Sequence, residues 1–190
     1  MGGFTCLTLL PSQRRAWYWS ALVRAEGRLV CLVDLDVRIP PRSLEIRADG
    51  LWADHICEER LEHWTIGNEA FGIALDDPGD ALGRALGDPT PLGFDLEWEA
   101  SSAPTPMTGS MGYVVDATVH GEVLIGSESL NIDVTGCWWH RWGNFDWIAL
   151  SAGLRPEGLR APVALEIDGQ RRALELILRQ DGWVSWTGDL

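Results

Sequence analysis

Lysine is absent from this chain of 190 residues, and all fifteen positively charged side chains are arginine. Schiff-base chemistry and covalent attachment of pyridoxal phosphate need a lysine amine, and a phosphate-binding loop of the Walker type needs its lysine. The sequence also lacks a nucleophile elbow, a GxGxxG motif opening a βαβ unit and an HExxH motif. Lysine-dependent catalysis is therefore excluded, while hydride transfer, acyl-enzyme chemistry and zinc proteolysis have no support in the sequence.

Positive charge and long apolar runs are both scarce. The formal net charge is −13 at pH 7, which argues against binding to nucleic acid, because phosphate backbones attract basic surfaces. No apolar run approaches the roughly 18 residues of a membrane-spanning helix. The four cysteines lie far apart without a CxxC pair, and the N-terminus shows no signal-peptide pattern. We therefore expect reduced thiols, no membrane span and a cytoplasmic location.

Alternation of apolar and polar residues recurs along the chain, which is typical of strands with one buried face. The stretches WYWSALVRA (17–25) and RLVCLVDLDV (28–37) predict a hairpin, and Asp49-Gly50 is a favoured hairpin turn. The segment QRRALELILRQ (170–180) fits a strand or a helix, and we favour a strand because an Asp-Gly turn bounds each side. The only convincing helical pattern covers residues 76–88.

These patterns predict an antiparallel all-β fold, either a lipocalin-like barrel or a two-lobed curved β-sandwich, with one short helix. The length suits a single domain over residues 1–190. A variant of this prediction has two β lobes, 1–100 and 113–190, joined by the connector 101–112, which is rich in proline, serine and glycine. Such a connector acts as a linker or as a loop over a site.

Eleven tryptophans are present, far more than a core needs, and an aromatic-lined cavity would use many of them. Four lie in GCWWHRWGNFDW (136–147). If Gly143-Asn144 is a two-residue turn, directly opposed residues point to the same face. One face then carries Trp138, His140, Trp142, Phe145 and Trp147, and the other carries Trp139, Arg141 and Asp146. The first face is either an aromatic core with one hydrogen-bonded histidine or the wall of a cavity.

Carboxylates and further aromatic residues occur in two other stretches. In FDLEWE (94–99), Asp95 and Glu97 alternate with Phe94, Leu96 and Trp98. The plain interpretation is one wet face and one core face, and the alternative places Asp95 or Glu97 in the cavity as an acid with a raised pKa. The stretch HICEERLEHW (55–64) gathers His55, Cys57, Glu58, His63 and Trp64, but its spacing matches no zinc signature, so we predict no metal site.

Three stretches together are similar to a family of bacterial AttH-like proteins and to hydroxyneurosporene synthase, the carotenoid hydratase. They are residues 44–82, PLGFDLEWEA (91–100) and residues 120–147, and the resemblance covers about residues 15–187. The motifs that carry it include Glu58, His63 and Trp64, and then Asp95 with Trp98. The resemblance implies a lipocalin-like fold around an apolar pocket. It also implies hydration, cyclisation or isomerisation of polyenes or polyketides, generally without a cofactor; some Diels–Alder-type cyclases share this architecture.

The chain departs from that family at its most charged motif. The usual block reads Arg-Asp-His-Ser-Trp-Gly and is followed by x-Arg-Asp-Trp. Here the first Arg-Asp pair is replaced by Trp138 and Trp139, and the serine by Arg141. His140, Trp142, Gly143, Asp146 and Trp147 match the pattern. The proton chemistry of that Arg-Asp pair therefore does not carry over unchanged.

Two main functions remain open. The first is a cofactor-free cyclase, isomerase or hydratase acting on a hydrophobic polyene, terpenoid or polyketide intermediate. In it His140, Asp146, Glu58 or Asp95 would move a proton, and the substrate would contact eight side chains: Trp138, Trp139, Trp142, Trp147, Phe145, Trp64, His63 and Trp98. The second is a lipocalin-like carrier of a hydrophobic metabolite.

A third function, weaker than these, is an interaction module with a vestigial pocket. A homodimer is compatible with all three, since a partner chain could cover an exposed aromatic patch or supply a missing lobe.

Overall fold

The computed structural model describes residues 2–24, 28–39, 41–76, 86–107, 111–143, 159–167, 170–179 and 182–187. Within these ranges most residues lie in antiparallel β-strands, and the helical element is a single 3-10 turn, η1 (Pro11–Gln13). The predicted antiparallel all-β class is confirmed. Among the described residues, no helix has the length and apolar character that crossing a bilayer requires.

The described strands form two sheets. The larger sheet has ten strands, and its main path is β1 (Gly2–Leu10), β2 (Arg15–Val23), β3 (Val30–Arg38), β6 (His63–Leu75), β7 (Gly87–Ala100), β9 (Gly112–Ile125) and β10 (Glu128–Arg141). Off this path, β5 (Leu51–Glu59) pairs with β6 and with β4 (Ile46–Ala48), and β8 (Thr105–Pro106) pairs with β9. The smaller sheet consists of β11 (Leu159–Ile167), β12 (Gln170–Arg179) and β13 (Gly182–Thr187).

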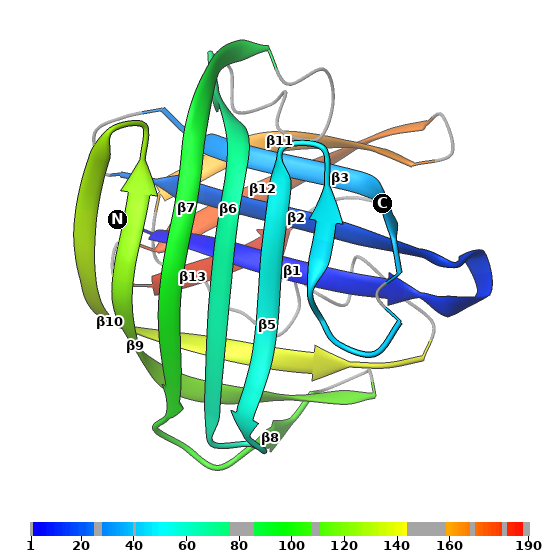
Figure 1. Cartoon of the computed structure of the whole chain (residues 1–190), viewed down its shortest axis with the longest axis vertical. Helices are drawn as coiled ribbons and strands as arrows, with labels where there is room; N and C mark the ends of the chain where they lie inside the picture. The colour runs from blue at the N-terminus through cyan, green and yellow to red at the C-terminus, as the bar shows by residue number, and fades with distance from the viewer. Residues whose placement is uncertain are drawn as a thin grey trace.

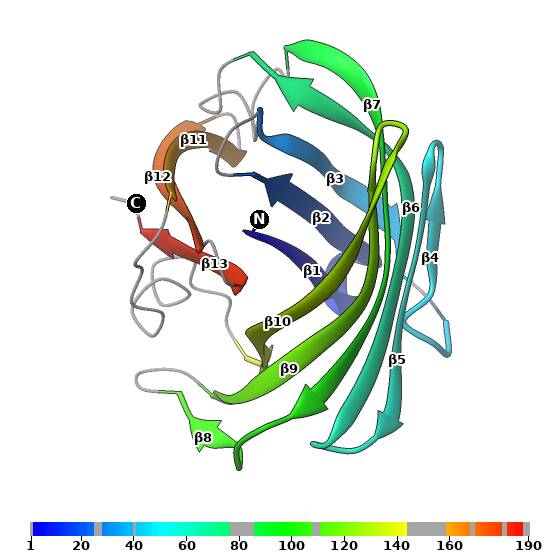
Figure 2. The ribbon, with the colours of Figure 1, turned by 90° about the vertical axis from the view of Figure 1, so that its left-hand side faces the viewer.

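The large sheet is strongly curved and open. β3 pairs with β6 only through Val30↔Ala74 and Cys31↔Ile73, so the sheet turns a corner there. Consequently β1, β2 and β3 run across β5, β6 and β7 (Figure 1). The two edge strands, β1 and β10, do not pair with each other, so the described strands form a curved sheet and not a closed barrel. β13 lies near both edges, on the concave side of the sheet (Figure 2).

Several local predictions can be compared with these elements. The hairpin between β2 and β3 is present, and Asp49-Gly50 joins β4 to β5, with Gly50 at φ +70°. Residues 170–179 form a strand, as favoured over a helix. The helix predicted over 76–88 falls mostly on residues outside the described ranges. For its last two residues, Gly87 and Asp88, the prediction is wrong, because they form the start of β7.

The segment 101–112 joins β7 to β9, and these two strands pair directly with each other. Part of the segment is itself structured, because Thr105–Pro106 forms β8 against β9. The single-domain organisation over 1–190 and its two-lobed variant stay predictions.

The main hydrophobic core lies on the concave side of the sheet. β7 shows why: Phe94, Leu96 and Trp98 are buried, while Asp95 and Glu97 between them are exposed. Alternate residues of a strand point to opposite faces, so burying one face fixes the register of the whole strand. The register between β6 and β7 runs without interruption from His63↔Glu99 to Leu75↔Gly87. The plain interpretation of this stretch, one wet face and one core face, is confirmed.

A second core surrounds a buried hydrogen-bond chain at the corner of the sheet. Tyr18 is fully buried, and its hydroxyl donates to Oδ1 of Asn68 at 2.8 Å while accepting from the Thr5 hydroxyl at 3.0 Å. The amide of Asn68 in turn donates to the carbonyl of Leu92 at 3.0 Å. The apolar side chains of this core are Ala16, Val37, Ile46, Leu51, Ala53 and Ala70. The chain therefore links β1, β2, β6 and β7 through buried polar groups whose partners are all present.

Removing one hydroxyl group from this chain should destabilise the fold. The substitution Tyr18→Phe leaves Oδ1 of Asn68 buried without its donor, and an unsatisfied buried polar group costs about 1–3 kcal/mol. Urea unfolding should show a loss of that size. Tyr113→Phe is the matched control, because the Tyr113 side chain is only partly buried, and it should change the free energy of unfolding by less than about 0.5 kcal/mol. Equal losses in the two variants would contradict the assignment.

Candidate functional site

A cavity of about 620 Å³ lies between the two edge strands of the large sheet. One wall is β1, which contributes its residues from Phe4 to Leu10, continued by Pro11 and Ser12. The facing wall is the end of β10 and the two residues after it, from Cys137 to Gly143. The remaining lining residues come from the strands between these edges and from the loop before β4: Leu44, His55, Trp64, Ile66 and Trp98. The cavity exists because the sheet curves without closing.

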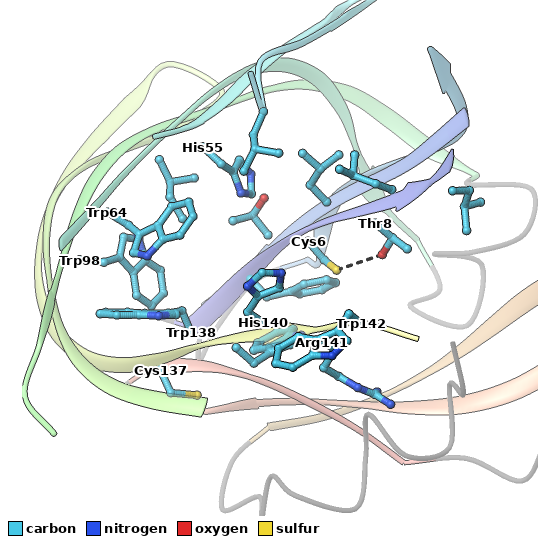
Figure 3. A pocket seen from close by; sticks show the side chains of 18 of the residues that line it. Cys6, Thr8, His55, Trp64, Trp98, Cys137, Trp138, His140, Arg141 and Trp142 are labelled. Atoms are coloured by element: carbon cyan, nitrogen blue, oxygen red, sulfur yellow. Dashed lines mark hydrogen bonds between the residues drawn. The ribbon is translucent and has the colours of Figure 1, made fainter. Parts of the chain in front are cut away.

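Five of the eleven tryptophans line this cavity. Strand register brings the first two together, since Trp64 of β6 is directly paired with Trp98 of β7 and both face inward. Trp138 of β10 lies beside them at the same end of the cavity (Figure 3). Trp139 and Trp142 complete the aromatic wall. The site is therefore lined mainly by indole rings, which offer flat apolar faces to a ligand.

Side chains from both faces of β10 reach the cavity. Trp138 and His140 project from one face, and Trp139 and Arg141 from the other, yet all four line it. β10 is an edge strand of the described sheet and pairs only with β9. Its open edge leaves room for side chains of either face beside the cavity. The sequence pattern predicts that only one face of this stretch lines the cavity. For the residues up to Arg141 this prediction is wrong, because both faces contribute lining side chains.

His140 lies at the exposed rim of the cavity, inside a small aromatic group. It is the direct cross-strand partner of Tyr113, whose hydroxyl is 3.5 Å from Nδ1 of His140. The His140 ring contacts Tyr113 and Trp142 edge-on, with centroid distances of 5.7 and 5.5 Å. The imidazole is held by ring contacts and one long polar contact, so solvent and a bound ligand can both reach it.

His55 lines the cavity from β5, on a different wall from His140 (Figure 3). It pairs across the strands with Ile66, and its ring meets Tyr18 edge-on at 6.1 Å. Burial lowers the pKa of His55 from 6.5 to about 4, because a charged imidazolium would lose its hydration. The side chain is therefore a neutral imidazole at neutral pH. Sequence reasoning considered His55 only as a metal ligand; the alternation Leu51, Ala53, His55 was the signal that it faces inward.

Two cysteines also lie in the wall. The Cys6 thiol lies 3.7 Å from the Thr8 hydroxyl, and Cys137 lines the opposite side. Burial raises the pKa of Cys6, so it is a thiol and not a nucleophilic thiolate at neutral pH. Cys57, by contrast, is exposed, so it does not share a cavity wall with His55. No cluster of three metal-ligating side chains occurs among the described residues.

The predicted carboxylates within the described residues, Asp95, Glu97 and Glu58, do not line the cavity. Asp95 and Glu97 are exposed on the face of β7 opposite Trp98, so the alternative that placed one of them in the cavity is wrong. Glu58 is exposed and lies 3.5 Å from the Thr65 hydroxyl, which donates to it.

His63 precedes Trp64 and points to the other face of β6, away from the cavity lining. The described residues end at Gly143 in this part of the chain. The other predicted site residues, Phe145, Asp146 and Trp147, lie outside them, and so does Asn144 of the predicted turn.

Residues 1–155 match the model of a protein family described as a domain of unknown function, DUF7064. The chain belongs to this family. The match covers the whole large sheet and therefore every residue that lines the cavity. No curated protein and no solved structure matches the chain. For this DUF7064 protein, arguments about function therefore rest on the site itself.

The buried His55 should make stability depend on pH. Its pKa is lowered from 6.5 to about 4, so between these values the unfolded chain binds the proton and the folded chain does not. As the pH falls from 6.5 towards 4, protonation of the unfolded chain lowers the free energy of unfolding. The total loss is about 3 kcal/mol, and above pH 6.5 there is none. The variant His55→Phe lacks this titration. Relative to the wild type, its free energy of unfolding should therefore rise by about 2–3 kcal/mol between pH 7 and pH 4.5. Chemical denaturation at several pH values would measure this, and a constant difference between the two proteins would contradict it.

Proposed function

We propose that this protein binds a hydrophobic small molecule in the tryptophan-lined cavity. The observation that carries the proposal is the convergence of five indole rings from three separate strands on one cavity. A volume of about 620 Å³ is in the range of about 300–1,000 Å³ that drug-sized ligands occupy. Polyenes, terpenoids and polyketides offer flat apolar surfaces that stack on such rings. The resemblance to AttH-like proteins and hydroxyneurosporene synthase supports the same ligand class.

Catalysis is the second candidate, and the observation that favours it is the pair of histidines on different walls. A cofactor-free isomerisation or cyclisation conserves atoms, because a proton removed from one carbon is returned to another. An imidazole can take up a proton at its free ring nitrogen and return it from the imidazolium that forms, and His140 and His55 are the groups placed to do so. A pKa near 4 makes His55 a weak base. Most of the acceleration would therefore come from holding the substrate in one folded conformation.

Binding can be measured by tryptophan fluorescence, with retinol as the probe. Trp138→Ala should weaken retinol binding at least about fivefold, since removing a buried aromatic anchor costs on the order of 1 kcal/mol or more. Trp52→Ala is the matched control, because Trp52 lies outside the cavity and its Nε1 donates to Glu45. Absence of binding by retinol and by other polyenes would support the interaction module instead.

An enzyme can be distinguished from a carrier protein by analysing the ligand chemically after incubation with the protein. A carrier returns its ligand unaltered, whereas an isomerase or cyclase yields a product of equal mass, and a hydratase adds one water. For a substrate that is converted, His140→Ala and His55→Phe should each lower kcat, by about 10²-fold if the residue transfers a proton. Unchanged turnover in both variants would reject histidine-based chemistry.

A further inference from the structure

The polar side chains of the cavity wall offer many hydrogen-bond donors and few acceptors. Among the described lining residues there is no aspartate, glutamate, asparagine or glutamine, so the wall contains no carboxylate or amide oxygen from a side chain. The hydroxyls of Thr5 and Thr8 already have partners in Tyr18 and Cys6. The other polar groups of the wall are the N–H groups of its indole, imidazole and guanidinium side chains, the Ser12 hydroxyl and two thiols. The wall is therefore rich in hydrogen-bond donors and poor in side-chain acceptors.

Three of these nitrogen atoms are closed off from solvent and have no hydrogen-bond partner: Nε1 of Trp64, Nε1 of Trp138 and Nε2 of His55. Buried indole N–H groups usually find an acceptor, and leaving one unsatisfied is unfavourable. All three belong to residues that line the same cavity. The acceptor that they lack is therefore expected to arrive with a ligand.

We propose that the ligand carries a hydrogen-bond-accepting oxygen, a carbonyl or a carboxylate, and that it presents this oxygen to the donors of Trp64, Trp138 and His55. This inference rests on the proposed binding function and narrows its ligand class. A pure hydrocarbon would fill the cavity but leave the three nitrogens unsatisfied. His55 serves as a donor in its Nε2–H tautomer, which its neutral state allows.

The arrangement of the side chains places the acceptor within the cavity. Trp64 and Trp138 lie together at one end, and His55 is on the adjoining wall formed by β5 (Figure 3). The N–H groups now lie in the wall, so binding requires small ring rotations that turn them towards the ligand. Such changes of rotamer are common when a binding site is filled. His140 at the rim remains available to the opposite part of the ligand.

A ligand with an ammonium group is the opposing possibility, because indole faces attract cations. Two features of the wall argue against it. The two indole nitrogens that need partners are donors only, which an ammonium cannot satisfy. No carboxylate among the described lining residues is present to pair with a positive charge. An ammonium ligand would therefore gain a cation–π contact and leave both indole N–H groups without an acceptor.

The test uses four probes with one C15 skeleton: farnesene, farnesal, farnesoic acid and farnesylamine. Tryptophan fluorescence of the full chain gives the Kd of each. Farnesal and farnesoic acid should each bind at least about fivefold more tightly than farnesene, as one net hydrogen bond predicts. The chain has no lysine, so the aldehyde forms no imine with a side chain. Farnesene or farnesylamine binding as tightly as farnesal would overturn the inference while leaving the proposed function intact; binding of none of the four would overturn both.

Variants that retain an aromatic ring but lack the indole N–H group test which side chains donate to the ligand oxygen. Trp64→Phe and Trp138→Phe, combined, should reduce the preference for farnesal over farnesene to below about twofold while farnesene binding changes little. Trp52→Phe, outside the cavity, should retain the full preference. A second measurement on the wild type does not depend on the variants folding: the indole N–H resonances of Trp64 and Trp138 should move downfield with farnesal and not with farnesene. Unchanged resonances in saturated protein would overturn the assignment.

Discussion

The buried hydroxyl of Tyr18 ties together parts of the sheet that backbone pairing does not join. β1 pairs only with β2 in the described sheet, and β3 touches β6 through two residue pairs. The chain from Thr5 through Tyr18 and Asn68 to the carbonyl of Leu92 connects β1 and β2 with β6 and β7. Because β1 forms one wall of the cavity while β6 and β7 carry Trp64 and Trp98, this chain connects opposite sides of the cavity.

The cavity is a product of incomplete closure. Each edge strand leaves backbone groups unpaired along one side, a feature that sheets commonly protect by covering or short length. Here both edges border the cavity, and β13 lies near both of them. Trp138 and Trp139 of β10 line the cavity at one of these edges. Aromatic lining and open edges are thus two aspects of one arrangement.

Local periodicity was enough to predict the strands, because the period of two is imposed by burying one face. The stretches 17–25 and 28–37 give the paired strands β2 and β3 that their alternation predicted, and Phe94, Leu96 and Trp98 point inward as expected. The placement of the cavity could not be predicted in the same way. It depends on which strands are edges and on the corner between β3 and β6, and these are long-range relations that alternation within one segment does not encode.

The errors at the site have different origins. Alternation along β7 already indicated that Asp95 lies on the face opposite Trp98, and the alternative that placed Asp95 in the cavity went against this pattern. The His55 side chain faces the cavity beside Ile66, its directly paired residue on β6. The sequence of the cluster HICEERLEHW does not identify this cross-strand partner. Both faces of β10 reach the cavity because β10 has no neighbour beyond it, a fact visible only in the assembled sheet.

The outer face of the large sheet has a consequence for how a ligand arrives. Asp95 and Glu122 are exposed and directly opposed across β7 and β9, beside Glu97 and Glu99, in a chain whose net charge is −13. This field repels anions at distances up to the Debye length, about 8 Å at physiological ionic strength. A carboxylate would therefore associate more slowly than a neutral carbonyl compound of the same shape, and added salt would speed only the carboxylate. The ionisation state of the molecule that enters is selected on the outside of the protein, before any lining residue is touched.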